Sequence, residues 1–321
     1  MAVLSPAAFA GTHFQPAVLY DLGGKFDKSV NESVAAGIAA FAGPAGIEVR
    51  EFEITNETQR EQTLRNMARR GDDPILAVGS GQASALAKVA KEFPQTRFTI
   101  VDATVKAPNV LSIVFRDHES AFLIGALSAM SSRSAKIGFV GGMDVPRIRR
   151  IACGYVQGAK HLKPEIAVLQ NMTGTTASAW NDPTKGAELA QAQFDRGVDV
   201  VFHAAGGTGL GVLQAAADAR RFAIGNEVNQ NGLFPGIMLS SMLRRVDQAA
   251  YNAVKSAADG TWRPGTLSLG LKERGIDWVL DENNAHFISA EMKALMDKIK
   301  AEIVSGAIKV VDSTATGKCP Y

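Results

Sequence analysis

The fold is decided by residues 16–37, which read Pro-Ala-Val-Leu-Tyr-Asp-Leu-Gly-Gly-Lys-Phe-Asp-Lys-Ser-Val-Asn-Glu-Ser-Val-Ala-Ala-Gly. The apolar run at 17–20 has the length and bulk of a buried β-strand. A glycine pair then permits a tight turn, and Asp27 or Ser29 can cap a following helix. The stretch therefore predicts a strand, a turn and a helix, with Asp21 at the carboxyl end of the strand, where open parallel sheets bind ligands.

This turn contains more polar and aromatic residues than a connection between a strand and a helix requires. A purely structural junction needs glycines and one cap, and that interpretation remains open for the stretch taken alone. Seven polar or aromatic residues nevertheless gather within eleven positions, namely Asp21, Lys25, Phe26, Asp27, Lys28, Ser29 and Asn31. Their crowding favours a ligand site.

Strands and helices alternate along the rest of the chain. Further strands are predicted at 47–54, 74–79, 97–102, 110–115, 136–140, 166–171, 198–203, 221–225, 236–241 and 308–312. Strict alternation of this kind indicates an α/β fold with parallel sheets covered by helices on both faces. Because 321 residues exceed the usual size of one hydrophobic core, we expect two lobes.

The composition excludes several classes of protein. With 46% apolar and 21% charged residues, the chain has the balance of an ordinary globular protein. Basic residues number 34 against 32 acidic ones, and they form no basic block, so a nucleic-acid partner is not expected. The apolar stretches, such as 121–130, are well short of the roughly 20 residues that span a bilayer.

The N-terminal residues 2–10 read Ala-Val-Leu-Ser-Pro-Ala-Ala-Phe-Ala. A short apolar piece that ends in Ala-x-Ala resembles the back half of a secretory signal peptide, so residues 1–10 are interpreted as its remnant, with cleavage after Ala10. The alternative is a disordered apolar tail. Export predicts a periplasmic protein, and the absence of cysteine from this segment gives no support to a lipid anchor.

The sequence contains two cysteines, Cys153 and Cys319. Neither this pair nor the five scattered histidines has metal-ligand spacing, so no metal site is expected. In an exported protein the two cysteines could form a disulfide that ties the C-terminal tail to the second lobe. Two free thiols, with Cys153 buried, are the alternative.

Three acidic residues, Asp21, Asp102 and Glu227, each end a predicted strand. Carboxylates in such places can act as an acid–base couple, or they can accept hydrogen bonds from sugar hydroxyls and purine N–H groups. Helix capping is the structural alternative for each, and for Asp102 alone it is the better one. Because no nucleophile motif or metal set accompanies them, the binding interpretation is preferred.

Two aromatic residues, Phe26 and Trp180, lie in predicted loops at strand ends. Exposed rings there can stack on a planar ligand, although most aromatic side chains belong to a core. The polar surroundings of Trp180, residues 174–183, favour exposure.

The sequence gives weaker evidence for two further candidate sites. The glycine cluster that starts at Gly206 resembles a dinucleotide fingerprint only in part, so no cofactor is expected, and its backbone N–H groups at a helix start would face a ligand instead. Arg244 and Arg245 are adjacent, and solvent exposure is usual for such pairs. One of them could reach the ligand.

The residues then match a known pattern in order along about 16–312. Asp-Leu-Gly-Gly-Lys-Phe-Asp-Lys-Ser-Val-Asn at 21–31, Glu-Ser-Ala-Phe-Leu-Ile-Gly-Ala-Leu at 119–127 and Ser-Ser-Met-Leu-Arg-Arg-Val-Asp at 240–247 resemble the basic membrane protein (BMP) family. That family comprises substrate-binding proteins of ABC importers, commonly for purine nucleosides. The resemblance implies a type I periplasmic-binding-protein fold, with two Rossmann-like lobes, parallel sheets, a three-strand hinge and a ligand cleft between the lobes.

This resemblance sets the expected organisation and function. The N-terminal lobe is expected at 11–117 plus about 244–263, and the C-terminal lobe at 118–243 plus about 264–321. The protein is expected to be a monomer that binds a purine nucleoside or purine base, catalyses no reaction and delivers its ligand to an ABC permease. The alternatives are an enzyme acting on a nucleoside or sugar, or a ligand sensor.

The family's ligand contacts carry over to Asp21, Asn31, Asp102 and the stacking residue Trp180. The phenylalanine that stacks on the base in the family is Val30 here, and Phe26 could replace its ring.

Two departures concern the groups that hold the ribose in the family. Its acid is Glu227 in this chain, and its lysine is Arg244. Glu227 and Arg244 could pair with each other and fill the space of a sugar, so the ligand is predicted as a purine with its sugar left open.

Overall fold

The computed structural model describes residues 14–27 and 29–321. The signal-peptide remnant predicted at 1–10 lies outside these residues. Among the helices that are described, none combines the length and the apolar character needed to cross a membrane.

The described chain folds into two compact units, each formed by two segments of the sequence. Unit 1 consists of the described residues up to Phe115 together with Arg245–Leu269. Unit 2 consists of Arg116–Arg244 and Gly270–Tyr321. The chain therefore passes from one unit to the other three times.

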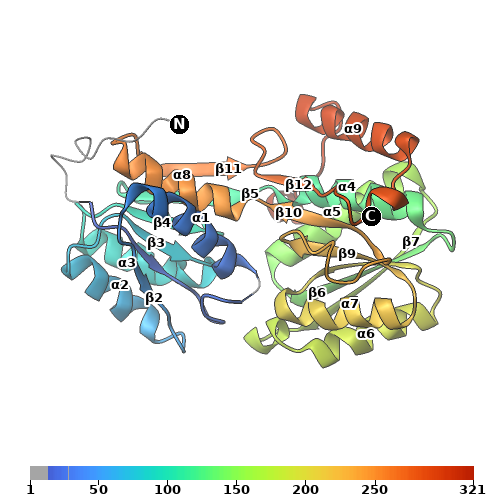
Figure 1. Cartoon of the computed structure of the whole chain (residues 1–321), viewed down its shortest axis with the longest axis horizontal. Helices are drawn as coiled ribbons and strands as arrows, with labels where there is room; N and C mark the ends of the chain where they lie inside the picture. The colour runs from blue at the N-terminus through green and yellow to red at the C-terminus, as the bar shows by residue number, and fades with distance from the viewer. Residues whose placement is uncertain (1–13, 28) are drawn as a thin grey trace. The chain divides into compact units, whose positions relative to one another are not determined.

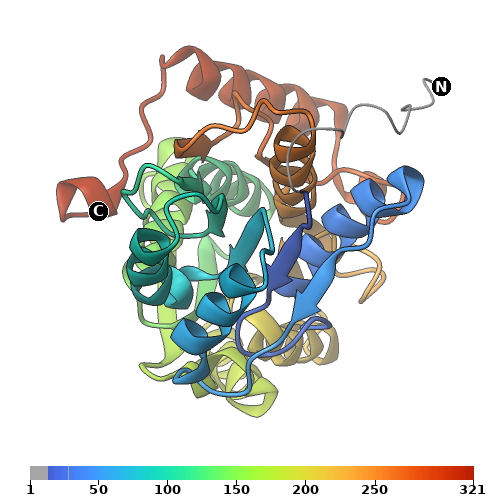
Figure 2. The same cartoon turned by 90° about the vertical axis from the view of Figure 1, so that its left-hand side faces the viewer.

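Unit 1 is a parallel sheet with helices on both faces (Figure 1). Among its described residues, the strands lie in the order β11-β5-β4-β3-β1-β2, and every neighbouring pair is parallel. Helices α1 (Val30–Ala45) and α8 (Val246–Ala258) pack together on one face, and α2 (Gln59–Arg69) and α3 (Ala83–Glu92) pack on the other. Figure 2 shows the strands and helices of this unit after a rotation of 90°. The strands are β1 (Ala17–Leu19), β2 (Arg50–Phe52), β3 (Ile75–Val78), β4 (Phe98–Val101), β5 (Val110–Phe115) and β11 (Gly265–Leu269).

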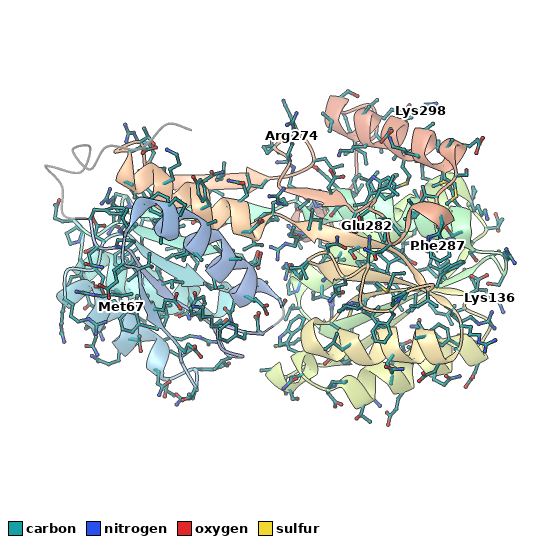
Figure 3. The ribbon with its side chains drawn as sticks, in the orientation of Figure 1. Met67, Lys136, Arg274, Glu282, Phe287 and Lys298 are labelled. Atoms are coloured by element: carbon teal, nitrogen blue, oxygen red, sulfur yellow. A yellow bond between two sulfur atoms is a disulfide. The ribbon has the colours of Figure 1, made fainter. Side chains whose placement is uncertain are left out.

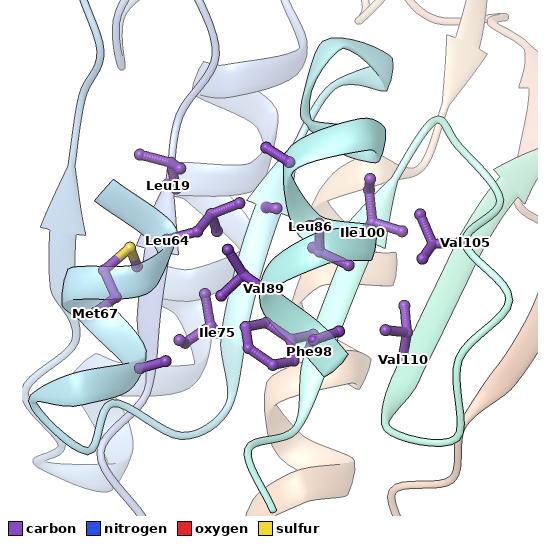
Figure 4. Packing of buried hydrophobic residues seen from close by; sticks show 14 of the residues in the cluster. Leu19, Leu64, Met67, Ile75, Leu86, Val89, Phe98, Ile100, Val105 and Val110 are labelled. Carbon is purple, nitrogen blue, oxygen red and sulfur yellow. The ribbon is translucent and has the colours of Figure 1, made fainter. Parts of the chain in front are cut away.

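One hydrophobic core cluster of unit 1 lies between its sheet and the pair α2 and α3 (Figure 4). Leu64 of α2 and Leu86 of α3 are completely buried, and they pack in one cluster with Ile75 and Phe98 of the strands. Burial of such a side chain contributes about 1.5–3 kcal/mol. This cluster holds the strands in place beneath the turns that carry the polar residues.

Unit 2 repeats the arrangement. Among its described residues, the strands lie in the order β12-β10-β9-β8-β6-β7, with β12 antiparallel to β10 and the other pairs parallel. Helices α4 (Asp117–Ser131) and α5 (Pro146–Leu162) pack together, as do α6 (Pro183–Asp195) and α7 (Gly209–Asp218) on the opposite face (Figure 1). The strands are β6 (Lys136–Met143), β7 (Ala167–Gly174), β8 (Val200–Ala204), β9 (Phe222–Glu227), β10 (Met238–Arg244) and β12 (Ile276–Trp278).

The C-terminal part of unit 2 is helical. It contains the 3₁₀ turn η5 (Ala285–Phe287), the helix α9 (Ala290–Ser305) and the short helix α10 (Ser313–Thr316). Helix α9 buries Met296 and Ile299, while Lys298 points outward (Figure 3). This one-sided burial follows from apolar residues spaced along one face of the helix.

The two sheets correspond strand by strand. The order β5-β4-β3-β1-β2 in unit 1 matches β10-β9-β8-β6-β7 in unit 2. The turn after β3 therefore corresponds to the turn after β8, and the end of β4 to the end of β9. Because the carboxyl ends of parallel strands meet at one edge of a sheet, each unit gathers these turns at such an edge.

The predicted α/β class with parallel sheets is confirmed, and one predicted strand is wrong. Residues 308–312 form no strand. The backbone of Val311 bonds instead to the side chain of Gln157 on α5, which accepts from its N–H at 2.8 Å and donates to its carbonyl at 3.0 Å. The strands β11 and β12 were not predicted.

The C-terminal tail is held on α5 covalently as well. Cys153 on α5 and Cys319 form a disulfide, with 5.7 Å between their Cα atoms and a sequence separation of 166. Asp312, in the same tail, lies 3.5 Å from the guanidinium of Arg150 on α5. The tail is thereby attached to α5 by a disulfide, an ion pair and hydrogen bonds.

Candidate ligand-binding site

In unit 1, the turn after β1 is held by Asn31. The Oδ1 atom of Asn31 accepts from the backbone N–H of Asp21 at 3.1 Å, and its Nδ2 atom donates to the carbonyls of Asp21 at 3.1 Å and Gly24 at 3.0 Å. Asn31 is buried, and both its N–H groups are used inside the turn. The structure therefore gives Asn31 a scaffolding role, and its direct contact with a ligand stays a prediction.

The same turn contains the cap of α1 and an exposed ring. The carboxylate of Asp27 accepts from the backbone N–H groups of Ser29, Asn31 and Glu32 at 2.8–3.1 Å. Of the two caps considered from the sequence, Asp27 is thus the one that supplies the hydrogen bonds. Phe26, just before it, leaves 73% of its surface exposed, which is unusual for an aromatic residue and leaves the ring open to stacking.

Two acids lie at corresponding strand ends, Asp102 after β4 in unit 1 and Glu227 at the end of β9 in unit 2. Both have left-handed backbones, with φ of 69° and 70°. A residue with a side chain rarely adopts this conformation, and such strain gathers at functional sites. In each unit, this conformation turns the backbone sharply at the carboxyl edge of the sheet.

The carboxylate of Asp21 has a partner that the sequence analysis missed. Arg60, near the start of α2, places Nη2 2.8 Å from Oδ1 of Asp21. Two glycines of the turn after β3 make room for this pair, because an added Cβ at Gly79 would lie 2.4 Å from the Asp21 carboxylate and one at Gly81 would lie 2.6 Å from the Arg60 guanidinium. Asp21, Arg60 and this turn therefore form one polar cluster at the edge of the unit 1 sheet.

In unit 2, Trp180 lies at the carboxyl edge of the sheet. It ends the 3₁₀ turn η3 (Ala177–Trp180) that follows β7, and it is half-buried. Its indole rests on Gly142 near the end of β6, where an added Cβ would lie 2.4 Å from the ring, and an added Cβ at Gly206 would lie 3.7 Å from the ring. The glycines thus form a floor for the ring at the place where ligands bind in such sheets.

Gly206 begins the turn η4 (Gly206–Thr208), which leads into α7, and its φ of 57° is left-handed. The turn is tied to the loop of Trp180 by Thr208. The Thr208 hydroxyl donates to the carbonyl of Ala179 at 2.9 Å and accepts from the backbone N–H of Asp182 at 2.7 Å. Trp180 is therefore held in position by backbone contacts on both sides.

Arg244 and Glu227, the pair considered from the sequence, belong to a larger charge network in unit 2. Nη1 of Arg244 lies 2.6 Å from Oε2 of Glu227, and Nε of Arg244 lies 2.9 Å from Oδ1 of Asp117. Arg147 bridges the same two acids, at 2.7 Å from Oε1 of Glu227 and 3.1 Å from Oδ2 of Asp117. Arg150 lies 3.1 Å from Asp117. The side chain of Arg244 is completely buried.

The ionisation of Asp117 follows from this network. Burial opposes its charge, but the positive charges of Arg244, Arg147 and Arg150 outweigh that effect and hold the pKa of Asp117 well below its usual value. Asp117 is therefore a carboxylate at neutral pH. The positive charge of the buried Arg244 is paired with Asp117 and Glu227.

The sequence contains an indication of Arg147 and Arg150, the two arginines of this network that were not predicted. The first turn of α5 reads Pro146-Arg-Ile-Arg-Arg, which places three cations at a helix N-terminus, where the helix dipole disfavours positive charge. Such an unfavourable arrangement indicates that acids from elsewhere in the fold compensate it. Arg147 and Arg150 meet Asp117 in this way.

The predicted site residues thus fall into two groups. Asp21, Phe26 and Asp102 lie in turns that follow strands of unit 1, and Asn31 lies in the first turn of α1. Trp180, Gly206, Glu227 and Arg244 lie at the carboxyl ends of the strands of unit 2 or in the turns that follow them.

Comparison with known proteins identifies the family. The Bmp family, described as ABC transporter substrate-binding protein PnrA-like, matches residues 14–314. The ABC transporter nucleoside-binding protein BmpA of Lactococcus lactis is 29% identical, with 93% of this chain and 89% of that protein covered. An uncharacterized lipoprotein of Pyrococcus abyssi is 30% identical, with 83% of this chain and 69% of that protein covered.

A solved structure agrees with the fold. The ABC transporter solute-binding protein of Aeropyrum pernix K1 superposes with a TM-score of 0.85 at 29% identity, and 94% of each chain is covered. The expected type I periplasmic-binding-protein fold is thereby confirmed. Because a relative is named as a lipoprotein, the expectation of export without a lipid anchor gains no support. The chain belongs to the PnrA-like family of ABC transporter substrate-binding proteins.

Proposed function

We propose that this protein binds a purine outside the cytoplasm and delivers it to an ABC permease. The observation that carries the ligand class is the position of Trp180, a half-buried indole held on Gly142 and Gly206 at the carboxyl edge of its sheet. A ring held in this way offers a stacking surface for a planar heterocycle. The related Lactococcus protein is named as nucleoside-binding, which supports a ligand that contains a planar heterocycle.

The polar residues suit the rest of a purine. Asp21 and Asp102 follow strands of unit 1 and supply acceptors for ring and exocyclic N–H groups, and the exposed ring of Phe26 adds a second aromatic surface. In this proposal these groups bind the ligand without reacting with it, so the ligand is released unchanged. Closure of the protein around the ligand creates the form that a permease recognises.

The charge network favours a ligand without a sugar. Each carboxylate oxygen of Glu227 already accepts from an arginine, at 2.7 Å and 2.6 Å, and Arg244 is completely buried. A ribose hydroxyl would have to compete with these charge-assisted bonds, which are stronger than bonds to a neutral hydroxyl. We therefore propose a free purine base as the ligand.

A thermal-shift panel on ligand-stripped protein tests this function. Adenine, guanine and hypoxanthine are compared with adenosine, guanosine, inosine, uridine and ribose. The bases should raise the melting temperature most, because a ligand at 100 times its Kd adds about 2.7 kcal/mol of stability. A larger response to nucleosides would contradict the exclusion of the sugar. No response to any purine would overturn the proposed function.

Trp180→Ala should weaken purine binding by about 5- to 150-fold, because stacking of a base on an aromatic side chain is worth ~1–3 kcal/mol. Isothermal titration calorimetry with the base that binds most tightly to the wild type measures the effect. Tyr321→Ala is the matched control, since this exposed aromatic residue lies in the C-terminal tail of the same unit. Equal purine affinities of the Trp180→Ala variant and the wild type would remove the stacking role.

A further inference from the structure

His203 is a buried histidine in unit 2. It lies near the carboxyl end of β8, and only 1% of its surface is exposed. Its Nε2 atom lies 3.0 Å from Oε1 of Gln230, in the loop after β9. The same Oε1 atom accepts from the backbone N–H of Asn226 at 3.0 Å, and an amide nitrogen could not do so. The Nε2–H group of His203 is therefore the donor to Gln230.

The Nδ1 atom of the same ring lies against the start of α7. An added Cβ at Gly209, the first residue of α7, would lie 2.1 Å from Nδ1. Because a neutral imidazole has only one N–H group, Nδ1 carries a lone pair, and among the described residues it has no hydrogen-bond partner. The neutral ring is thus packed between α7 and the loop that contains Gln230.

A proton on Nδ1 would be unfavourable in this place. It would create a buried cation whose new N–H group lacks an acceptor. The first turn of α7 contains no acidic residue, and the N-terminus of a helix disfavours positive charge. Among the described residues, Glu227 is the charged group that acts on the ring, and its carboxylate is already paired with Arg147 and Arg244.

We propose that His203 is a pH-sensitive contact, which holds the start of α7 and the loop after β9 together only while its ring is neutral. Gly206 lies in the turn that leads into α7, and Glu227 lies where β9 passes into the loop. Acid therefore favours opening of the part of unit 2 that carries these two candidate site residues. The contact lies within unit 2, so the inference holds whatever the ligand is.

The electrostatics of the folded protein agree with this packing. Burial lowers the pKa of His203 from its ordinary value of 6.5 to about 4, although the bond to Gln230 and the charge of Glu227 oppose the shift. The unfolded or opened chain binds a proton below about pH 6.5, whereas the folded chain binds it only near pH 4. Stability is therefore lost as the pH falls from about 6.5 to about 4.

The experiment compares the wild type with His203→Gln, which keeps an N–H donor and carries no charge at any pH. Urea denaturation gives the equilibrium constant of unfolding for each protein between about pH 7.5 and pH 4.5. Below about pH 6.5 the constant of the wild type should rise up to ~10-fold more per pH unit than that of the variant, because unfolding takes up one more proton. The other titrating groups are present in both proteins, so their contributions cancel.

His161→Gln is the matched control, since His161 lies exposed on α5 of the same unit. It should keep the pH dependence of the wild type. Hydrogen exchange of the amides of α7, corrected for the intrinsic rate, tests the local opening. Between about pH 7 and pH 5.5, protection of α7 should fall more in the wild type than in His203→Gln, and an equal fall in both would overturn the local opening.

Nitrogen NMR of the histidine rings in the wild type decides the matter if His203→Gln does not fold. At about pH 5.5 the ring of His203 should be neutral and should carry its proton on Nε2. A charged ring at that pH, or a proton on Nδ1, would overturn the inference. Identical pH dependence of unfolding in the wild type and His203→Gln would overturn it as well.

Discussion

Replacing Arg244 by methionine should lower the free energy of unfolding by about 3–5 kcal/mol, because it leaves buried carboxylates without their cation. Arg244 is completely buried between Asp117 and Glu227, at 2.9 Å and 2.6 Å from their oxygens. Arg147 would remain beside both acids, but it could not replace the contacts that Arg244 makes with Oδ1 of Asp117 and Oε2 of Glu227. Urea denaturation of the variant and the wild type measures the difference.

The matched control is Arg149→Met, at an arginine of α5 in the same unit. Arg149 pairs with Asp144 at 2.5 Å, but 67% of its side chain is exposed, and such surface pairs contribute at most about 1 kcal/mol. Glu227→Gln introduced together with Arg244→Met should restore part of the stability, because a neutral amide is easier to bury than an unpaired charge. Equal stability of the two single variants would show that the network does not stabilise unit 2.

The pH dependence of unfolding reports on the same network. Because the pKa of Asp117 is lower in the folded protein than its ordinary value of 3.8, folding favours its ionised form. Its contribution is fully present above about pH 4 and is lost as the pH falls below that value. In Arg244→Met less of this contribution exists, so stability should fall less steeply with acid than in the wild type.

Removing the disulfide with Cys153→Ala and Cys319→Ala should destabilise the protein by about 2–5 kcal/mol. The bond joins two positions separated by 166 in sequence, so its loss greatly enlarges the freedom of the unfolded chain. The hydrogen bonds between Gln157 and Val311 would then hold the tail without covalent support. Denaturant unfolding under non-reducing conditions measures the loss.

Each single cysteine variant serves as the control for the double variant. Either substitution breaks the same bond, so the two losses should be equal and should not add in the double variant. Thiol titration of the denatured, unreduced wild type should find no free thiol. Two free thiols, or additive losses, would contradict a bonded pair.

Much of the fold could be predicted from local patterns. The apolar run at 17–20, its glycine turn and the capped helix formed as predicted, because strand length, turn chemistry and capping are properties of neighbouring residues. The alternation of such pieces indicated the parallel sheets. Matches in order along the chain indicated the family, and the resemblance placed Trp180 and Glu227 among the site residues.

Other features were decided by tertiary structure. Residues 308–312 have the composition of a strand, yet Val311 bonds to the side chain of Gln157. Residues 265–269 form β11 beside β5 although most of them are exposed and their pattern does not alternate clearly. A strand needs a partner edge, and no local pattern reveals whether one is available.

The charged residues of the site show most clearly which features follow from the local sequence and which depend on the tertiary structure. The sequence by itself determined that Asp21, Asp102 and Glu227 end strands, because a carboxylate after an apolar run can be read from neighbouring residues. Only the folded chain decided that Arg60 pairs with Asp21 and that Arg244 and Arg147 share Glu227. These partners lie 17 to 80 residues apart in sequence, and the energy of an ion pair depends on distance and burial in space.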